Sequence, residues 1–315
     1  AETQSPETVP FVTAAYDKVT DTAALKAWID RAHAVGYVAV DTETTGLNEM
    51  TADLVGVSLS VEPGRACYIP LAHKTGASDD LFGSDELAPG QIPLDAALAL
   101  LKPLLEDPSV LKIGQNMKYD AKILARYGLD VTPIDDTMLM SYAMNAGLHS
   151  HGMDQLSERY LGHHPIEIKS LLGSGKTQIT FDRVDMDEAV KYAAEDADIT
   201  LRLWQTFKPQ LHRARVATVY ETLERPLVPV LAEMEMAGIK VDKSVLSKMS
   251  NAFAQKMAQL EDEIHEMAGE KFNVGSRSQV GESLFERMGL PGGQLIANPV
   301  PGSDEIPADV LTPHI

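Results

Sequence analysis

Three short strand-like runs lie close together near the start of the chain and limit the folds that are open to it. The runs are residues 37–43, 54–61 and 66–71, each rich in apolar and β-branched residues and separated from the next by a short turn-forming stretch. Strands joined this closely pair antiparallel, because a parallel pair needs a longer crossover connection. The sequence therefore predicts an antiparallel meander of three strands.

Helical patterns take over along the rest of the chain. One helix is also expected before the first strand, because the stretch Thr20 to Thr22 can cap it and Gly36 can end it. A fourth strand-like run lies at residues 110–114. The other helical segments are 94–105, 116–127, 137–145, 153–161, 185–211, 221–235, 243–268 and 276–288. This order favours an α/β fold in which helices flank a mixed β-sheet.

The length and the changes of composition predict several parts. A chain of 315 residues is long enough for about two domains. Residues 1–10 are expected to be a disordered lead-in, residues 11–215 a first domain and residues 216–290 a helical extension. Residues 291–315 are rich in Pro, Gly and other small residues, which predicts a linker or a disordered tail.

The net charge of −19 limits how this chain can bind nucleic acid. Phosphate is normally held by Lys and Arg, so binding mainly by the protein's own positive field is excluded, whereas local contact through divalent cations is not. Cys67 is the only cysteine, which excludes an internal disulfide framework and a cysteine-based zinc site. No apolar run is long enough for a membrane span, and residues 1–10 do not resemble a signal peptide, so a cytoplasmic protein is expected.

Asp41 and Glu43 end the first strand-like run, where acidic residues are unfavourable. Residues i and i+2 of a strand point to the same face, so the two carboxylates repel each other unless a cation lies between them. Oxygen ligands of this kind suit Mg²⁺. The alternative is a solvent-facing strand end that is followed by a turn at residues 44–46.

A second acidic motif, Tyr192-Ala-Ala-Glu-Asp196, lies in the helical segment 185–211. Residues i and i+4 share a helix face, so Tyr192 and Asp196 project together, and the intervening alanines let another element approach closely. Glu195 and Asp198 are expected to point elsewhere and to be solvated. The alternative is an ordinary amphipathic helix with an acidic outer face.

Polar and aromatic residues gather where the strand at 110–114 passes into a helix. Gln115 and Asn116 lie near the expected N-terminus of that helix, where negative groups are favoured. Tyr119 can stack on a base, and Asp120 faces inward one turn into the helix. The alternative is that Asn116 only caps the helix and that Asp120 favours its first turn.

Together these motifs resemble those of the DEDDy exonucleases, and more closely those of the 3′–5′ proofreading domains of bacterial family A DNA polymerases (DNA polymerase I). The similarity covers about residues 12–290. The stretches that carry it include Asp41-Thr-Glu-Thr-Thr-Gly-Leu47, Tyr68-Ile-Pro-Leu-Ala-His73, Gly114-Gln-Asn-Met-Lys-Tyr-Asp120 and Tyr192-Ala-Ala-Glu-Asp-Ala-Asp198. The resemblance implies a ribonuclease H-like fold, with residues 11–215 as the exonuclease domain and residues 216–290 as the truncated helical start of a polymerase thumb.

The resemblance also implies a phosphodiester hydrolase with two divalent metal ions, for which Mg²⁺ is expected and Mn²⁺ or Zn²⁺ is an alternative at one site. Asp41 would bridge both ions, and Glu43 and Asp196 would complete the ion site whose water becomes the nucleophile. Asp120 would serve the second ion through water. Tyr192, together with Glu43, would orient the attacking water.

The implied substrate is the 3′ end of single-stranded or frayed DNA, which is released as nucleoside 5′-monophosphates during proofreading. The implied substrate contacts are Leu47 as a wedge near the terminal base, Tyr119 and Phe181 against bases, and Gln115 and Asn116 at the backbone or the terminal sugar. For Leu47 and Phe181 the alternative is ordinary core packing. A monomer is expected, with the missing polymerase domain as its partner.

Two motifs of the polymerase palm and fingers, Asp-Tyr-Ser and Val-His-Asp-Glu, do not occur in this sequence. The chain is therefore expected to be a fragment of a longer polymerase or a truncated product, and to be unable to polymerise. Two other functions stay open, an RNA-trimming nuclease of the ribonuclease D type and a non-catalytic scaffolding module. The thumb-like helices at 221–288 argue against the first, and the presence of all four carboxylates argues against the second.

Overall fold

The structure is a computed structural model that describes residue 11 and residues 16–75 and 86–291. The chain divides into two compact units, Ala1–Gly238 and Ile239–Ile315. The predicted lead-in at 1–10 lies outside the described residues, and so does the predicted tail apart from Pro291. None of the described helices combines the length and the apolar character needed to cross a bilayer.

A mixed sheet of six strands forms the centre of the first unit. β2, β3 and β4 pair antiparallel in sequence order, which confirms the predicted meander, whereas β1, β5 and β6 join the sheet by parallel pairing. The sequence alone does not predict β1 and β6, because they are too short to show an alternating pattern. In their order across the sheet the strands are β1 (Asp17–Lys18), β4 (Arg65–Pro70), β3 (Leu54–Glu62), β2 (Tyr37–Thr44), β5 (Leu111–Gly114) and β6 (Ile134–Asp136).

Most helices of the first unit follow the predicted segments, and α2 and α4 match them residue for residue. A π-helical turn at Ser157–Leu161 extends α5, and another at Tyr220–Glu224 leads into α9. The bounds are α1 (Thr22–Val35), α2 (Leu94–Leu105), α3 (Met117–Arg126), α4 (Thr137–Asn145), α5 (Met153–Leu156), α6 (Ile168–Leu172), α7 (Met186–Arg213), α8 (Ala217–Val219) and α9 (Arg225–Ala237).

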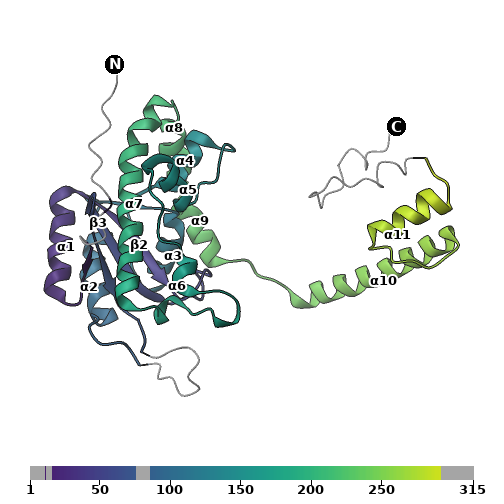
Figure 1. Ribbon diagram of the computed structural model, residues 1–315, viewed down its shortest axis with the longest axis horizontal. Helices are drawn as coiled ribbons and strands as arrows, with labels where there is room; N and C mark the ends of the chain where they lie inside the picture. Colours follow the sequence, from purple (N-terminus) through teal and green to yellow (C-terminus); the bar gives the residue numbers. More distant parts are fainter. Residues whose placement is uncertain (1–10, 12–15, 76–85, 292–315) are drawn as a thin grey trace. The chain divides into compact units, whose positions relative to one another are not determined.

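These helices cover both faces of the sheet (Figure 1). α1, α2 and α3 pack on one face, in a core that includes Val38 and Val40 of β2. α7 packs on the other face, where Leu201 joins Ala39 in a second cluster. Because side chains alternate along a strand, residues 41 and 43 face α7, and residue 42 faces the side of α3. This alternation determines which helices reach the acidic end of β2.

α10 (Lys243–Ala268) is the main element of the second unit, and its bounds are those that the sequence predicts. The carboxylate of Asp242 accepts hydrogen bonds from the backbone N–H groups of Ser244 and Val245, at 2.8 and 3.3 Å, which fixes the start of the helix. Gly269, in the left-handed conformation, ends it. α11 (Arg277–Gly281) and a π-helical turn at Glu282–Arg287 follow.

Candidate active site

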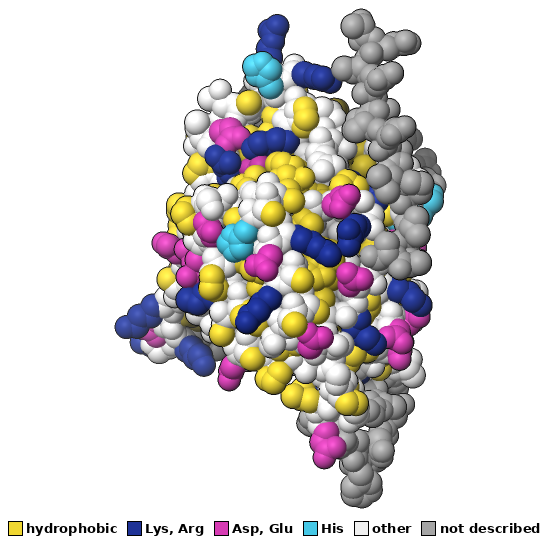
Figure 2. Space-filling model, turned by 90° about the vertical axis from the view of Figure 1, so that its left-hand side faces the viewer, with side chains coloured by type: hydrophobic (Ala, Val, Ile, Leu, Met, Phe, Trp, Pro, Cys, Tyr) yellow, Lys and Arg dark blue, Asp and Glu magenta, His cyan; other side chains and the backbone are white. Residues whose placement is uncertain are grey.

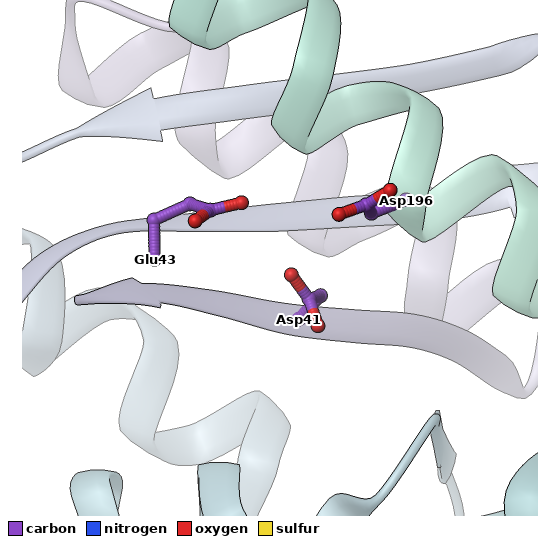
Figure 3. Close-up of side chains that lie close together, drawn as sticks. All are labelled: Asp41, Glu43 and Asp196. Carbon is purple, nitrogen blue, oxygen red and sulfur yellow. The ribbon is translucent and has the colours of Figure 1, made fainter. Parts of the chain in front are cut away.

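Three carboxylates from two elements meet between the sheet and α7. Asp41 and Glu43 project from β2 on the same face, and Asp196 projects toward them from α7 (Figure 3). One oxygen from each of the three side chains lies within 4.8 Å of the others. The structure therefore brings together the strand motif and the helix motif, which lie far apart in the sequence.

Two of the three acids are buried and Asp41 is half-buried beside them, which makes their simultaneous ionisation unfavourable. Glu43 is only 8% exposed, and Asp196 is buried as well. Burial and the charge of Asp196 raise the pKa of Asp41 well above its usual value. Burial, together with the charges of Asp41 and Asp196, does the same to the pKa of Glu43, and burial raises the pKa of Asp196.

A divalent cation fits this group of carboxylates. Oε1 of Glu43 is buried and has no hydrogen-bond partner among the described residues, although a buried acceptor normally has one. A cation among the three side chains would coordinate their oxygens and offset their mutual repulsion. Carboxylate oxygens are the ligands that Mg²⁺ and similar hard cations prefer. Asp41, Glu43 and Asp196 are thus the residues that could hold an ion.

Asp120 lies beside this group but is held differently. It projects from α3 on the opposite side of β2 and is 2% exposed. Its Oδ1 accepts hydrogen bonds from the backbone N–H and the hydroxyl of Thr42, at 3.0 and 2.5 Å. Burial and the charge of Asp41 raise the pKa of Asp120, which places Asp41 in its electrostatic surroundings. The acidic motif does not by itself mark Thr42 as a site residue, although its place between Asp41 and Glu43 on the strand puts it on the face toward α3.

Tyr192 lies one helical turn before Asp196 on α7, as the spacing predicts. Burial, and next the charge of Asp196, raise the pKa of Tyr192 well above its usual value, so the phenol keeps its proton at neutral pH. The ring of Tyr192 lies 5.9 Å from that of Phe181, centroid to centroid. Ala194 and Ala197 are fully buried in a cluster with Ala66 of β4, which confirms the predicted close approach.

The prediction that Glu195 and Asp198 are solvated is wrong, because both are buried. Glu195 accepts hydrogen bonds from the backbone N–H of Ile166, at 2.7 Å, and shares one with Nε2 of His163 at 2.9 Å. Asp198 pairs with Arg202 and accepts from further donors of the first unit. The chain covers α7 on more than one side, and the helical pattern alone cannot show what lies on each of those sides.

Leu47 follows β2 and is 94% exposed, so core packing does not describe it. Its loop is nevertheless held in place, because the hydroxyl of Tyr119 donates to the carbonyl oxygen of Gly46 at 2.6 Å. The same hydroxyl lies 2.5 Å from that of Thr44. Tyr119 therefore supports the backbone next to Leu47.

Gln115 and Asn116 differ in how the protein engages their side chains. The Gln115 amide donates to the carbonyl oxygen of His151 at 2.8 Å and accepts from the hydroxyl of Thr137 at 2.5 Å. Asn116 is exposed, has a left-handed backbone (φ 62°) and makes no side-chain cap. The alternative of capping by Asn116 is wrong, because Asp136 accepts from the N–H groups at the helix start instead.

Phe181 is 3% exposed and packs with Tyr68 and Val184 in a core cluster. In this structure it is therefore a core residue, which was the alternative to a contact with a base. The hydroxyl of Tyr68 lies 2.9 Å from Nε2 of His73, which is also buried. The Tyr68–His73 pair supports the core cluster against which Tyr192 packs. The helix and strand periodicity of the sequence does not reveal this pair.

On the face that Figure 2 draws, the charged side chains that the structure describes form no extended positive surface of the kind that attracts nucleic acid. Basic, acidic and apolar side chains are interspersed there, and the described residues form no continuous basic patch on it. This distribution agrees with the net charge of −19. Contact with a polyanion on that face would therefore depend on local groups.

Comparison with known proteins identifies the family. The family of 3′–5′ exonucleases matches residues 16–212, and family A DNA polymerases match residues 243–306. The chain is 54% identical to DNA polymerase I of Rhizobium leguminosarum over 91% of its own length, and 42% identical to DNA polymerase I of Pseudomonas aeruginosa over 88%. It spans only 29% and 30% of those two relatives.

Solved structures share the fold. The polymerase domain of Pol1 from M. smegmatis, in complex with DNA primer-template and dNTP, matches 86% of this chain and 41% of its own, with a TM-score of 0.66 and 22% identity. Brucella melitensis NrnC matches 71% of this chain and 92% of its own, with a TM-score of 0.51 and 22% identity. The mixed sheet flanked by helices is thus the ribonuclease H-like fold of these nucleases. The chain belongs to the 3′–5′ exonuclease family associated with bacterial DNA polymerase I, and from residue 243 it matches the beginning of a family A polymerase domain.

Proposed function

We propose that this chain is a metal-dependent 3′–5′ exonuclease that hydrolyses the 3′-terminal phosphodiester of single-stranded or frayed DNA to nucleoside 5′-monophosphates. It would act as the proofreading part of a DNA polymerase I in the bacterial cytoplasm, as a monomer. One observation carries the proposal within this family. Asp41, Glu43 and Asp196 each place a carboxylate oxygen within 4.8 Å of the other two, which is the arrangement that a bound cation needs.

The acidic residues would hold two divalent ions, with Mg²⁺ as the expected metal. Asp41, Glu43 and Asp196 would bind the first ion, and Asp41 and Asp120 would bind the second. Bound ions of this kind supply a water of lowered pKa and stabilise charge on the phosphate and the leaving oxygen. Because Oδ1 of Asp120 is already hydrogen-bonded to Thr42, Asp120 is the less available ligand.

Glu43 and Tyr192 would position the attacking water. A carboxylate oxygen of Glu43 that does not bind the ion would accept a hydrogen bond from that water. Tyr192 keeps its proton, because burial raises the pKa of its phenol, so it can hydrogen-bond to the water but cannot act as a tyrosinate base. Phe181 would serve by packing beside the Tyr192 ring rather than by direct base contact.

The substrate proposal depends on exposed groups near the acidic end of β2. Leu47 presents an apolar side chain that an unpaired base can contact, and Tyr119 adds an aromatic ring beside it. Stacking of a base on an aromatic ring such as that of Tyr119 contributes about 1–3 kcal/mol and does not depend strongly on sequence. The exposed amide of Asn116 would bind the DNA backbone or the terminal sugar. Gln115, whose amide is held in place by the carbonyl oxygen of His151, would bind the same part of the DNA.

The test uses the full chain with a 5′-labelled single-stranded DNA, in Mg²⁺ and in EDTA. We expect stepwise shortening from the 3′ end and release of nucleoside 5′-monophosphates only with Mg²⁺. Equal shortening in EDTA would refute the metal-dependent mechanism. A matched RNA strand serves as the second substrate, and faster cleavage of RNA would favour the ribonuclease D type of activity instead.

A further inference from the structure

One face of α3 holds the segment 44–54, which carries Leu47. Tyr119 lies at the start of this face and fixes the backbone at Gly46. One turn later, Lys122 binds the carboxylate of Glu49. At the last residue of α3, the guanidinium of Arg126 donates to the carbonyl oxygens of Glu49 and Ala52. Just after the helix, the hydroxyl of Tyr127 accepts a hydrogen bond from the N–H of Leu54. The loop is therefore attached to α3 along its length.

Lys122 is the buried member of this set. Its side chain is 3% exposed, whereas lysines are rarely buried unless they are paired. Its ammonium binds two carboxylates, that of Glu49 in the loop and that of Glu235, at 2.5 Å, on α9. Burial alone would lower the pKa of Lys122, but the two carboxylates raise it, so the ammonium stays charged. One side chain thus joins two separate segments.

The second partner, Glu235, lies on α9 near the C-terminal end of the first unit. α9 packs against α3, and Lys118 of α3 adds a second ion pair with Glu235, at 2.6 Å. Lys118 is about one-third exposed and has no contact with the loop among those that the structure records for it. Lys118 and Lys122 therefore share a partner on α9, but only Lys122 also binds Glu49.

We propose that Lys122 is a positioning residue that determines substrate specificity, because it clamps the Leu47 loop to α3 and α9. The inference rests on the proposed exonuclease function and adds a residue to it. A fixed loop can hold Leu47 against the terminal base and separate that base from a complementary strand, whereas a loose loop cannot. Loss of Lys122 should therefore lower kcat/KM for 3′ ends that are partly paired, and should change it little for ends that are already single-stranded.

The test compares Lys122→Met with the control Lys118→Met in the full chain. Methionine keeps the apolar stem, and the two carboxylates left behind are 28% and 40% exposed, so water can solvate them. Three substrates are used: single-stranded DNA, a duplex with a mispaired 3′ nucleotide, and the p-nitrophenyl ester of thymidine 5′-monophosphate, which lacks the preceding nucleotide and any complementary strand. We expect Lys122→Met to lower kcat/KM for the duplex about tenfold, for the single strand less than about threefold, and for the ester not at all. Lys118→Met should behave as the wild type on all three.

A double-mutant cycle separates positioning from a general structural effect. If Lys122 acts through Leu47, Lys122→Met should add little to the loss that Leu47→Ala already causes on the duplex. Independent, additive losses, or an equal loss on all three substrates, would overturn the proposal. Thermal unfolding of each variant monitors the fold, and Glu49→Gln, which removes the loop partner and leaves Lys122 paired with Glu235, replaces Lys122→Met if that variant is unstable.

The wild-type control distinguishes failure of this inference from failure of the proposed function. A wild-type chain that cleaves no substrate in Mg²⁺ contradicts the exonuclease function itself. A wild-type chain that cleaves all three, with Lys122→Met unchanged on the duplex, contradicts only the role of Lys122.

Discussion

Thr42 holds Asp120 by two hydrogen bonds that converge on one carboxylate oxygen. The backbone N–H and the hydroxyl of Thr42 lie 3.0 and 2.5 Å from Oδ1 of Asp120. β2 thus presents two carboxylates to α7 on one face and anchors a third, from α3, on the other. The strand therefore orients carboxylates on both of its sides, which explains why Asp120 stands apart from the group of three.

Thr42→Val should lower activity while the fold is retained, because it removes the hydroxyl and nearly keeps the side-chain volume. Loss of a hydrogen bond to a charged group typically costs about 1.5–3 kcal/mol, so we expect kcat to fall about tenfold. Thr200→Val is the matched control, because the buried hydroxyl of Thr200 has no hydrogen-bond partner to lose. Steady-state kinetics on single-stranded DNA measure both, and equal rates for the two variants would contradict this role of Thr42.

Asp41→Ala should abolish the Mg²⁺-dependent release of nucleoside monophosphates, by at least about a thousandfold, because Asp41 is the proposed ligand of both ions. The same change should raise Tm in EDTA, since it removes one of three neighbouring carboxylates that repel one another. Nuclease assays and thermal unfolding measure the two effects. Asp30→Ala, at an exposed carboxylate on α1, is the control. Unchanged nuclease activity in Asp41→Ala would remove the basis of the site assignment.

The sequence predicts those parts of the fold whose pattern is local. α10 and α4 follow from their helical apolar period, and the meander follows from the short turns between its strands. β1 and β6 depend on pairing with β4 and β5 rather than on their own two or three residues. No local pattern specifies such strands, because the partner supplies both their hydrogen bonds and their register.

The same difference between local sequence pattern and tertiary packing decides how much of the candidate site could be predicted. The spacing of Asp41 and Glu43 predicts two carboxylates on one face, but their proximity to Asp196 comes from the sheet and the packing of α7. Resemblance to a family supplies that tertiary information, whereas spacing does not. Burial of Glu195 could not be predicted in this way, because its partner His163 lies in a loop whose position no periodicity fixes.

Metal-free protein should lose stability as the pH rises. Burial raises the pKa of Asp41, Glu43, Asp120 and Asp196, so the folded state binds more protons than the unfolded state above about pH 4, the ordinary carboxyl pKa. The free energy of unfolding therefore falls with rising pH in this range. We expect Tm in EDTA to drop by several degrees between about pH 5 and pH 8, and Mg²⁺ to restore it at pH 8.

Calorimetry of the wild type and of Asp41→Ala across this pH range tests the cause. Removal of one carboxylate should make the fall in Tm shallower and should reduce the gain from Mg²⁺. Parallel curves for the two proteins would mean that the pH dependence arises outside the site.

Tyr192→Phe should reduce kcat about ten- to a hundredfold without changing the shape of the pH profile between pH 6 and pH 9. The change removes the hydroxyl that would orient the attacking water and keeps the ring that lies beside Phe181, so Tm should change little. Because burial and Asp196 raise the pKa of the phenol, tyrosinate is not available as a base in this range. A wild-type rate that rises toward pH 9, together with a flat profile in Tyr192→Phe, would instead assign the hydroxyl to proton abstraction. Tyr142→Phe, at an exposed ring on α4, controls for the loss of a phenol elsewhere.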